Sequence, residues 1–194
     1  ILFPIGNDYL TCDGDDGNTT AGTAQSVDGR FPKIFREARK LLVEAIDLLR
    51  LIAPVDVVVI PGNHERDSMF HLGDAIECWY HADKSVTVDN VSNVRKYYAF
   101  GDTVFGLTHG DTIKQEKLPL IGAVERPDLW AKCKRRVWYL GHHHHYQLKE
   151  GLTKLKIESR KLKVENFLFF NFPFSILKFP FIHINGHKIT NNNY

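Results

Sequence analysis

Three polar motifs, each placed directly after a short apolar run, constrain the fold of this 194-residue chain more than any other feature. They are Gly62-Asn63-His64-Glu65, Thr108-His109-Gly110-Asp111 and Gly141-His142-His143-His144. The apolar runs before them are short and rich in β-branched or aromatic residues, which predicts buried strands that end in turns. In open α/β sheets, ligands bind beyond the carboxyl ends of the strands, so we expect the motifs to meet in one place.

A fourth apolar run opens the chain and ends in Gly6-Asn7-Asp8. It adds an amide and a carboxylate to the imidazoles of the other motifs, and such oxygen and imidazole ligands suit Mn, Fe or Zn. An Asn-His pair after a strand is usually turn chemistry on its own, but four such elements in order predict a metal site. The histidines at 142–145 resemble an expression tag, yet this run is internal and follows a predicted strand.

The order of these motifs resembles that of the calcineurin-like metallophosphoesterases, whose pattern runs D-x-H, GD, GNH[DE], a lone His and GHxH. The resemblance covers roughly residues 1–145. It implies an α/β (α+β) fold, in which a β-sandwich flanked by helices carries two metal ions at its strand ends. Because no D-x-H motif precedes the first glycine, it also implies a domain that is N-terminally truncated and lacks its first strand.

Carried over onto this sequence, the resemblance implies that Asn63, His109 and His142 bind one divalent metal ion. Asp8 is implied to bridge both ions of the family, although Asn7 stands directly after the glycine where the family usually has its aspartate. The register of this element is therefore open by one residue.

The second ion of the family's pair is implied to bind His144. Its other ligands come from the D-x-H motif, which is not found before Gly6. We therefore expect one well-formed site for Mn, Fe or Zn and one incomplete site.

Catalysis is assigned by the same resemblance to His64, which would face the leaving oxygen as a general acid or stabilise the charge that forms there. Two metal ions would clamp the phosphoryl group and lower the pKa of a bridging water. Glu65 and Asp111 are candidates to orient imidazoles, and Asn7 is a candidate to support the site or contact substrate. Both carboxylates are equally well explained as solvated loop residues.

The segments between the motifs read as alternating elements. Helical spacing of apolar residues predicts helices over residues 32–52 and 67–82, the second capped by Asp67, and one or two more over 112–132. Short strands are expected at 86–89 and 97–100. The Gly- and Asp-rich stretch at 13–30 is a long loop, either a lid over the metal site that helps to choose substrate or a mobile insertion.

Two domains of the sequence are distinguished by composition. Residues 1–150 hold the motifs, whereas residues 151–194 are rich in Phe and lose their acidic residues after Asn166. The C-terminal segment is either a pair of strands that closes the sandwich or a tail that is not native to the domain, and we favour the tail.

The formal net charge of +2 makes the chain only mildly basic and does not indicate extended nucleic-acid binding. The nearest approach to a basic stripe is residues 132–136, which a charged helix end before a strand explains better. Three widely spaced cysteines suggest reduced thiols and a cytoplasmic location. No apolar stretch is long enough to cross a bilayer, so we expect no membrane partner.

These observations predict a metal-dependent phosphoesterase, a hydrolase whose substrate is a phosphate ester. We expect a phosphodiester of nucleic acid or of a nucleotide. The alternative is an incomplete, catalytically impaired fragment that keeps one metal site, or a binding module.

Overall fold

The computed structural model describes residues 1–27, 29–142, 148–151 and 167–171. The strands are β1 (Leu2–Gly6), β2 (Val55–Ile60), β3 (Val86–Asp89), β4 (Arg95–Phe100), β5 (Thr103–Thr108), β6 (Arg135–Leu140), β7 (Leu148–Gly151) and β8 (Phe167–Asn171). The helices are α1 (Phe31–Arg50), α2 (Arg66–Tyr80), α3 (Leu118–Glu125) and α4 (Pro127–Lys132), with a 3-10 helix at Gln115–Lys117.

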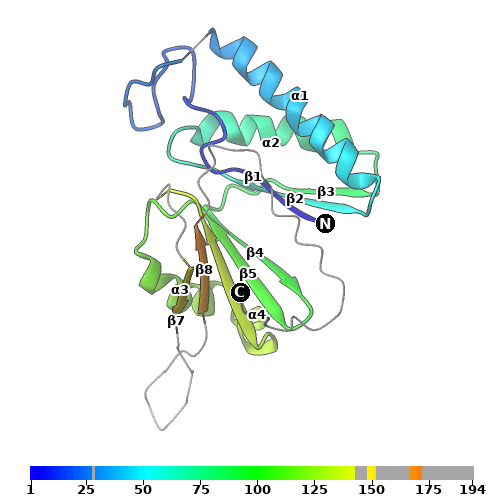
Figure 1. The fold of residues 1–194 in the computed structure, drawn as a ribbon, viewed down its shortest axis with the longest axis vertical. Helices are drawn as coiled ribbons and strands as arrows, with labels where there is room; N and C mark the ends of the chain where they lie inside the picture. Colours follow the sequence, from blue (N-terminus) through cyan, green and yellow to red (C-terminus); the bar gives the residue numbers. More distant parts are fainter. Residues whose placement is uncertain (28, 143–147, 152–166, 172–194) are drawn as a thin grey trace, which may run out of the picture.

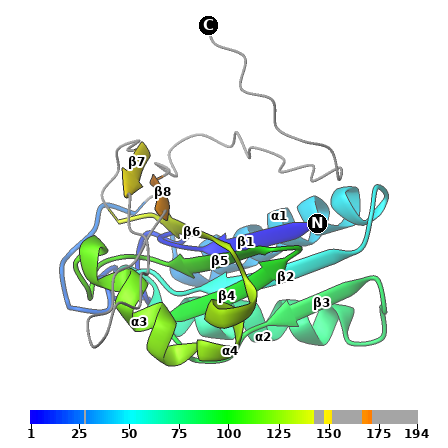
Figure 2. The ribbon, with the colours of Figure 1, turned by 90° about the horizontal axis from the view of Figure 1, so that it is seen from below.

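The strands form two sheets that lie face to face (Figure 1). The first is parallel, in the order β1-β2-β3, and α1 and α2 are its crossover connections. The second has the order β4-β5-β6-β8-β7, with β5, β6 and β8 parallel and the outer strands antiparallel to their neighbours. Figure 2 shows these layers from the side of the second sheet, where α3 and α4 lie. The predicted β-sandwich flanked by helices is confirmed.

Three buried clusters fill the interfaces between these layers. The largest packs α1 and α2 onto the first sheet and includes Ile46 and Val57. A second lies between the sheets and includes Ile60 and Leu107. A third packs Trp138 of β6 with Leu118, the first residue of α3. Because β2 is covered on both faces, its β-branched residues are buried throughout, and this explains its continuous apolar run.

The predicted strands and helices are all present, and their ends differ from the expected ones by one or two residues. The stretch at 112–132 holds both α3 and α4. Of residues 151–194, the structure describes only 151 and 167–171. Residues 167–171 form β8, which pairs in parallel with β6. Whether this segment closes the domain natively or is a foreign tail stays a prediction.

The loop between β1 and α1 is tied to the N-terminal end of α2. The Asp13 carboxylate accepts hydrogen bonds from the backbone N–H groups of Ser68 at 2.7 Å and Asp67 at 3.2 Å. The Thr20 hydroxyl accepts one from the N–H of Arg66 at 2.9 Å and donates one to Asp13 at 2.5 Å. Since the first N–H groups of a helix have no partner inside it, this loop supplies the cap of α2.

The expectation that Asp67 caps this helix is therefore wrong. The helix begins at Arg66, and its N-cap residue Glu65 makes no capping hydrogen bond through its side chain. The capping carboxylate of Asp13 stands 55 positions before Ser68, so no local pattern could reveal it.

Replacing Asp13 with Ala should lower the free energy of unfolding by about 0.5–2 kcal/mol, because two N–H groups of α2 lose their partner. Burial alone would raise the pKa of Asp13, but hydrogen bonds from Ser68, Thr20 and Asp67 hold it below 3.8. The loss should therefore be complete at neutral pH and should disappear as the pH falls through this lowered pKa. Urea unfolding at several pH values measures both effects.

Asp15→Ala is the matched control, because Asp15 lies in the same loop and is exposed. Equal stabilities of the Asp13 and Asp15 variants at pH 7 would contradict the capping role.

Candidate metal centre

The loops that follow β1, β2, β5 and β6 meet at one edge of the two sheets, as the sequence predicts (Figure 1). Backbone hydrogen bonds join them in pairs. The N–H of Asn7 donates to the carbonyl of Ile60 at 2.7 Å, which links the first two loops. The N–H groups of Gly141 and His142 both donate to the carbonyl of His109 at 3.0 Å, which links the other two.

Four side chains from these loops bring their donor atoms together around His109, which is 2% exposed. Its Nε2 lies 2.7 Å from Oδ1 of Asn63, 3.1 Å from Nδ1 of His142 and 3.2 Å from Oδ2 of Asp8. Asn63 Oδ1 and His142 Nδ1 are 3.0 Å apart. The structure thus brings together the predicted residues Asp8, Asn63, His109 and His142.

The other ring nitrogen of His109 is held by Asn7. Nδ1 lies 2.6 Å from the amide oxygen of Asn7, so a proton on Nδ1 is donated to that oxygen. In the neutral imidazole this leaves a lone pair on Nε2, directed at Asn63 and Asp8. Asn7 therefore orients the imidazole that Asp8 approaches from the opposite side, and both residues have a place in the site.

This donor set fits a divalent metal ion. With the proton of His109 on Nδ1, Nε2 has no hydrogen to donate to the oxygens of Asn63 and Asp8 beside it, whereas a cation can be shared by all four residues. Ligand atoms bound to a first-row metal at about 2.0–2.2 Å lie about 3 Å from each other, which is close to the separations found here. The two imidazoles, one carboxylate and one amide oxygen are ligands of the kind that such ions accept.

The charge of Asp8 is favoured by its surroundings. Burial alone would raise its pKa, but the hydrogen-bonding and electrostatic interactions with His109 and the backbone N–H of His64 hold the pKa below 3.8. The N–H of His64 lies 3.1 Å from the Asp8 carboxylate. A carboxylate kept ionised at the centre of the group is what cation binding requires.

A left-handed turn delivers Asn7 and Asp8 to the site. Their φ angles are 65° and 68°, and Gly6 before them has a φ of 93°. Among residues with a side chain, Asn and Asp are the ones that most often adopt this region. Across the turn, a Cβ at Gly62 would overlap the Asp8 carboxylate, so the approach of the two loops needs a glycine there.

The carboxyl group of Glu65 stabilises this turn through hydrogen bonds with its backbone. It is fully buried and accepts hydrogen bonds from the backbone N–H groups of Asp8, at 2.7 Å, and of Leu10. Burial, joined by the charge of Asp8, raises the pKa of Glu65 to about 8, against the effect of the N–H donors. Its contacts are with backbone amides and not with an imidazole.

His64 lies beside the cluster on the loop that carries Asn63. Its Nδ1 is 3.1 Å from the carbonyl oxygen of Thr11, which can only accept, so Nδ1 carries a proton. Nε2 is the nitrogen left to exchange a proton with another molecule. The carbonyl of Thr11 has no signature in the sequence and was not foreseen as a contact of the site.

The remaining candidate residues lie elsewhere. Asp111 forms an ion pair with Arg66 at 3.1 Å, which joins the loop after β5 to the start of α2. Its expected role in orienting an imidazole stays a prediction. His144, the expected ligand of a second ion, lies outside the described residues.

The sequence model of the family described as calcineurin-like phosphoesterase matches residues 1–186. The chain belongs to this family. Membership assigns it to the metal-dependent phosphoesterases, a class of hydrolases, and the Asp8-His109-His142 group is a candidate place for the metal. No curated protein and no solved structure matches the chain. Within the described ranges, none of the helices of this phosphoesterase is long and apolar enough to cross a membrane.

Asn7→Gly should weaken binding of Mn²⁺ by about 10- to 100-fold, because the imidazole of His109 loses the partner that orients it. Glycine tolerates the left-handed φ of this position, so the backbone is not strained by the change. Asn7→Asp keeps an acceptor for Nδ1 and should retain most of the affinity. Isothermal titration calorimetry measures both; Asn93→Gly, at an exposed site, is the control.

An affinity for Mn²⁺ that stays at the wild-type value in Asn7→Gly would overturn the orienting role of Asn7. A loss equally large in Asn93→Gly would show that the effect is not local to the site.

The wild-type chain should bind one Mn²⁺ ion tightly, because Asp8, Asn63, His109 and His142 furnish one set of converging donors. The stoichiometry of the same titration checks this expectation. Two ions bound per chain with equal affinity would contradict the expectation of a single tight site.

Proposed function

We propose that this chain hydrolyses a phosphodiester of a nucleic acid or a nucleotide at a metal centre formed by Asp8, Asn63, His109 and His142. The observation that carries the proposal is the convergence of three ligand atoms, from Asp8, Asn63 and His142, on Nε2 of the buried His109, with separations of 2.7–3.2 Å. His64 stands on the same loop as one of these ligands and has a ring nitrogen available for proton transfer.

Mn, Fe or Zn is the metal that this mixed nitrogen and oxygen donor set favours. When bound, a divalent ion neutralises phosphoryl charge and lowers the pKa of nearby water, which supplies a nucleophile near neutral pH. Asp8 contributes the negative charge that would hold the ion, and the hydrogen bond that Nδ1–H of His109 donates to Asn7 keeps His109 in the tautomer that can bind it.

The proposed acid is His64 in its doubly protonated form. Its Nδ1–H donates to the carbonyl of Thr11 at 3.1 Å, which fixes the plane of the ring. A proton on Nε2 is then the one that passes to the leaving oxygen, after which the neutral ring keeps its bond to Thr11. A positioned acid of this kind is worth about 10²–10⁴-fold in rate.

A diester suits the charge around the centre better than a monoester does. Arg66 is the cationic side chain that directly follows the GNHE motif, and Asp111 takes up part of its charge at 3.1 Å. A phosphodiester carries one negative charge, whereas a monoester carries nearly two near neutral pH. Because Asp111 offsets part of the charge of Arg66, we expect the singly charged ester to be the better substrate.

A cytoplasmic location is part of the proposal. All three cysteines are free, with Cys12 and Cys133 buried and Cys78 exposed, and this fits a reducing compartment.

His64→Ala should lower the kcat for bis-p-nitrophenyl phosphate in the presence of Mn²⁺ by about 10²–10⁴-fold, because the leaving oxygen loses its proton donor. Binding of Mn²⁺ should remain within about twofold of wild type, since His64 is not among the proposed ligands. Initial rates and calorimetry on the same preparations give the two readouts.

His81→Ala is a matched control. His81 is exposed at the end of α2 and, like His64, places Nδ1 against a backbone carbonyl, that of Cys78 at 2.9 Å. Full turnover by His64→Ala would contradict the role of His64. Absence of turnover by the wild-type chain with Mn²⁺, Fe²⁺ and Zn²⁺ would contradict the enzyme and favour the impaired fragment or binding module.

A further inference from the structure

A hollow of about 800 Å³ lies between the N-terminal halves of α1 and α2. From α1 it is lined by Phe31, Phe35, Arg36 and Arg39, and from α2 by Asp67, Ser68, His71 and Ala75. The two phenylalanine rings are 6.0 Å apart between centroids and are half-buried. Its volume lies within the range of small-ligand sites, and aromatic and guanidinium groups share its wall.

Positive charge is concentrated along this end of α1. Residues 30–40 hold five basic side chains and one acidic side chain, for a net charge of +4 in a chain whose total is +2. Lys40 pairs with Glu37 at 2.9 Å, but in the described part of the chain neither Arg36 nor Arg39 lies within ion-pair distance of a carboxylate. The first turn of α1 has no acidic residue, and cations at a helix N-terminus oppose its dipole. The stability of the helix therefore does not explain them.

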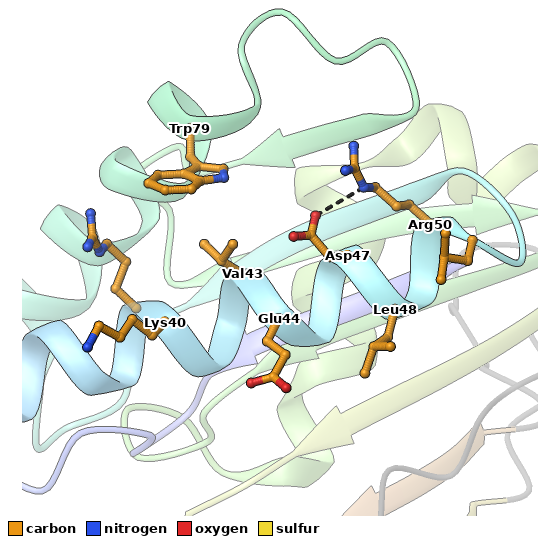
Figure 3. Close-up of a pocket in the computed structure, with 9 residues that line it drawn as sticks. Lys40, Val43, Glu44, Asp47, Leu48, Arg50 and Trp79 are labelled. Carbon is orange, nitrogen blue, oxygen red and sulfur yellow. Dashed lines mark ion pairs between the residues drawn. The ribbon is translucent and has the colours of Figure 1, made fainter.

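The positive strip ends halfway along the helix. Arg39 lies over the ring of Trp79 at 5.4 Å, and Trp79 is 56% exposed. Figure 3 shows the next hollow along the same two helices, where Trp79 stands over Val43 and two acidic side chains, Glu44 and Asp47, follow. The acidic side chains Glu44 and Asp47 share this second hollow with Lys40 and Arg50, so the excess of positive charge is largest along the N-terminal half of α1.

The hollow adjoins the metal centre through one short stretch of loop. Asp13 lines the hollow, and its charge is already taken up by the N–H groups at the start of α2. Two residues earlier, the carbonyl of Thr11 holds the ring of His64. A chain whose phosphate lies at the metal centre thus has only the 11–13 segment to cross before it reaches Phe31 and Phe35.

We propose that this hollow binds a single-stranded segment of a nucleic-acid substrate, next to the phosphodiester at the metal centre. The inference rests on the proposed function and assigns its substrate class. Arg36 and Arg39 contact phosphates of the strand, and the rings of Phe31 and Phe35 stack with its bases. Aromatic rings interleaved with cations are the usual means of binding single strands without sequence preference, and paired bases of a duplex cannot stack on them.

The test measures binding of fluorescein-labelled oligothymidylate to the full chain by fluorescence anisotropy, with Ca²⁺ in place of Mn²⁺ to limit cleavage. Arg36→Gln with Arg39→Gln should weaken binding at least about tenfold and reduce the slope of log K against log salt by about 1.4, or about 0.7 per lost contact. Phe35→Leu keeps an apolar side chain in the helix packing but removes the ring, and should weaken binding about tenfold.

Lys134→Gln with Arg135→Gln is the charge-matched control, because both residues are exposed before or at the start of β6, in the other basic stretch of the chain. The control should bind the oligonucleotide as the wild type does. All variants should hydrolyse bis-p-nitrophenyl phosphate at the wild-type rate, since that small diester does not reach the hollow.

The proposal would be overturned if the variant with Arg36→Gln and Arg39→Gln bound the oligonucleotide as tightly as the wild type does. A loss of binding confined to the control variant, or an equal affinity of the wild type for duplex DNA, would also overturn it. A wild-type chain that binds no oligothymidylate would overturn it too. Because turnover of bis-p-nitrophenyl phosphate is measured separately, failure of the hollow as a strand site is distinguishable from failure of the phosphoesterase function.

Discussion

The imidazole of His109 is the group on which the arrangement of the site depends. It is buried at the end of β5 and contacts all three of the other motif loops, through Asn7 and Asp8, through Asn63 and through His142. These loops come from both sheets, so the contacts of one ring fix how the carboxyl ends of the sheets meet. The position of this side chain therefore depends on the position of three other loops, and His109 is only two residues from Leu107 in the core between the sheets.

The sequence predicts the parts of this arrangement that depend on patterns of neighbouring residues. Strands with both faces buried have continuous apolar runs, as in β2, and the amphipathic spacing of α1 predicts a helix that covers a sheet. The order of the four motifs was enough to identify the family, and the placement of the motifs at strand ends was enough to predict that they meet. The choice of Asp8, Asn63, His109 and His142 came from the resemblance to the family, and the structure brings these four side chains together.

Contacts between distant segments could not be predicted in the same way. The cap of α2 comes from Asp13 in another loop, and the partner of His64 is the backbone carbonyl of Thr11, which no residue type marks. The basic end of α1 was missed for a different reason. The net charge of the whole chain is small, so five cations within residues 30–40 are concealed by acidic residues elsewhere, and only their position beside Phe31 and Phe35 makes them notable.

The left-handed turn at Asn7 and Asp8 joins the chemistry of the site to the stability of the fold. A residue other than glycine in this conformation costs of order 1–3 kcal/mol. Hydrogen bonds of the backbone N–H groups offset this cost: Asn7 donates to the carbonyl of Ile60, and Asp8 and Leu10 donate to the Glu65 carboxyl group. The buried carboxyl group of Glu65 lies close to the charged carboxylate of Asp8. This proximity, together with burial, raises the pKa of Glu65. The residues that hold the strained turn are therefore also the ones that place the Asp8 carboxylate beside His109, where the donor atoms of the candidate metal centre converge.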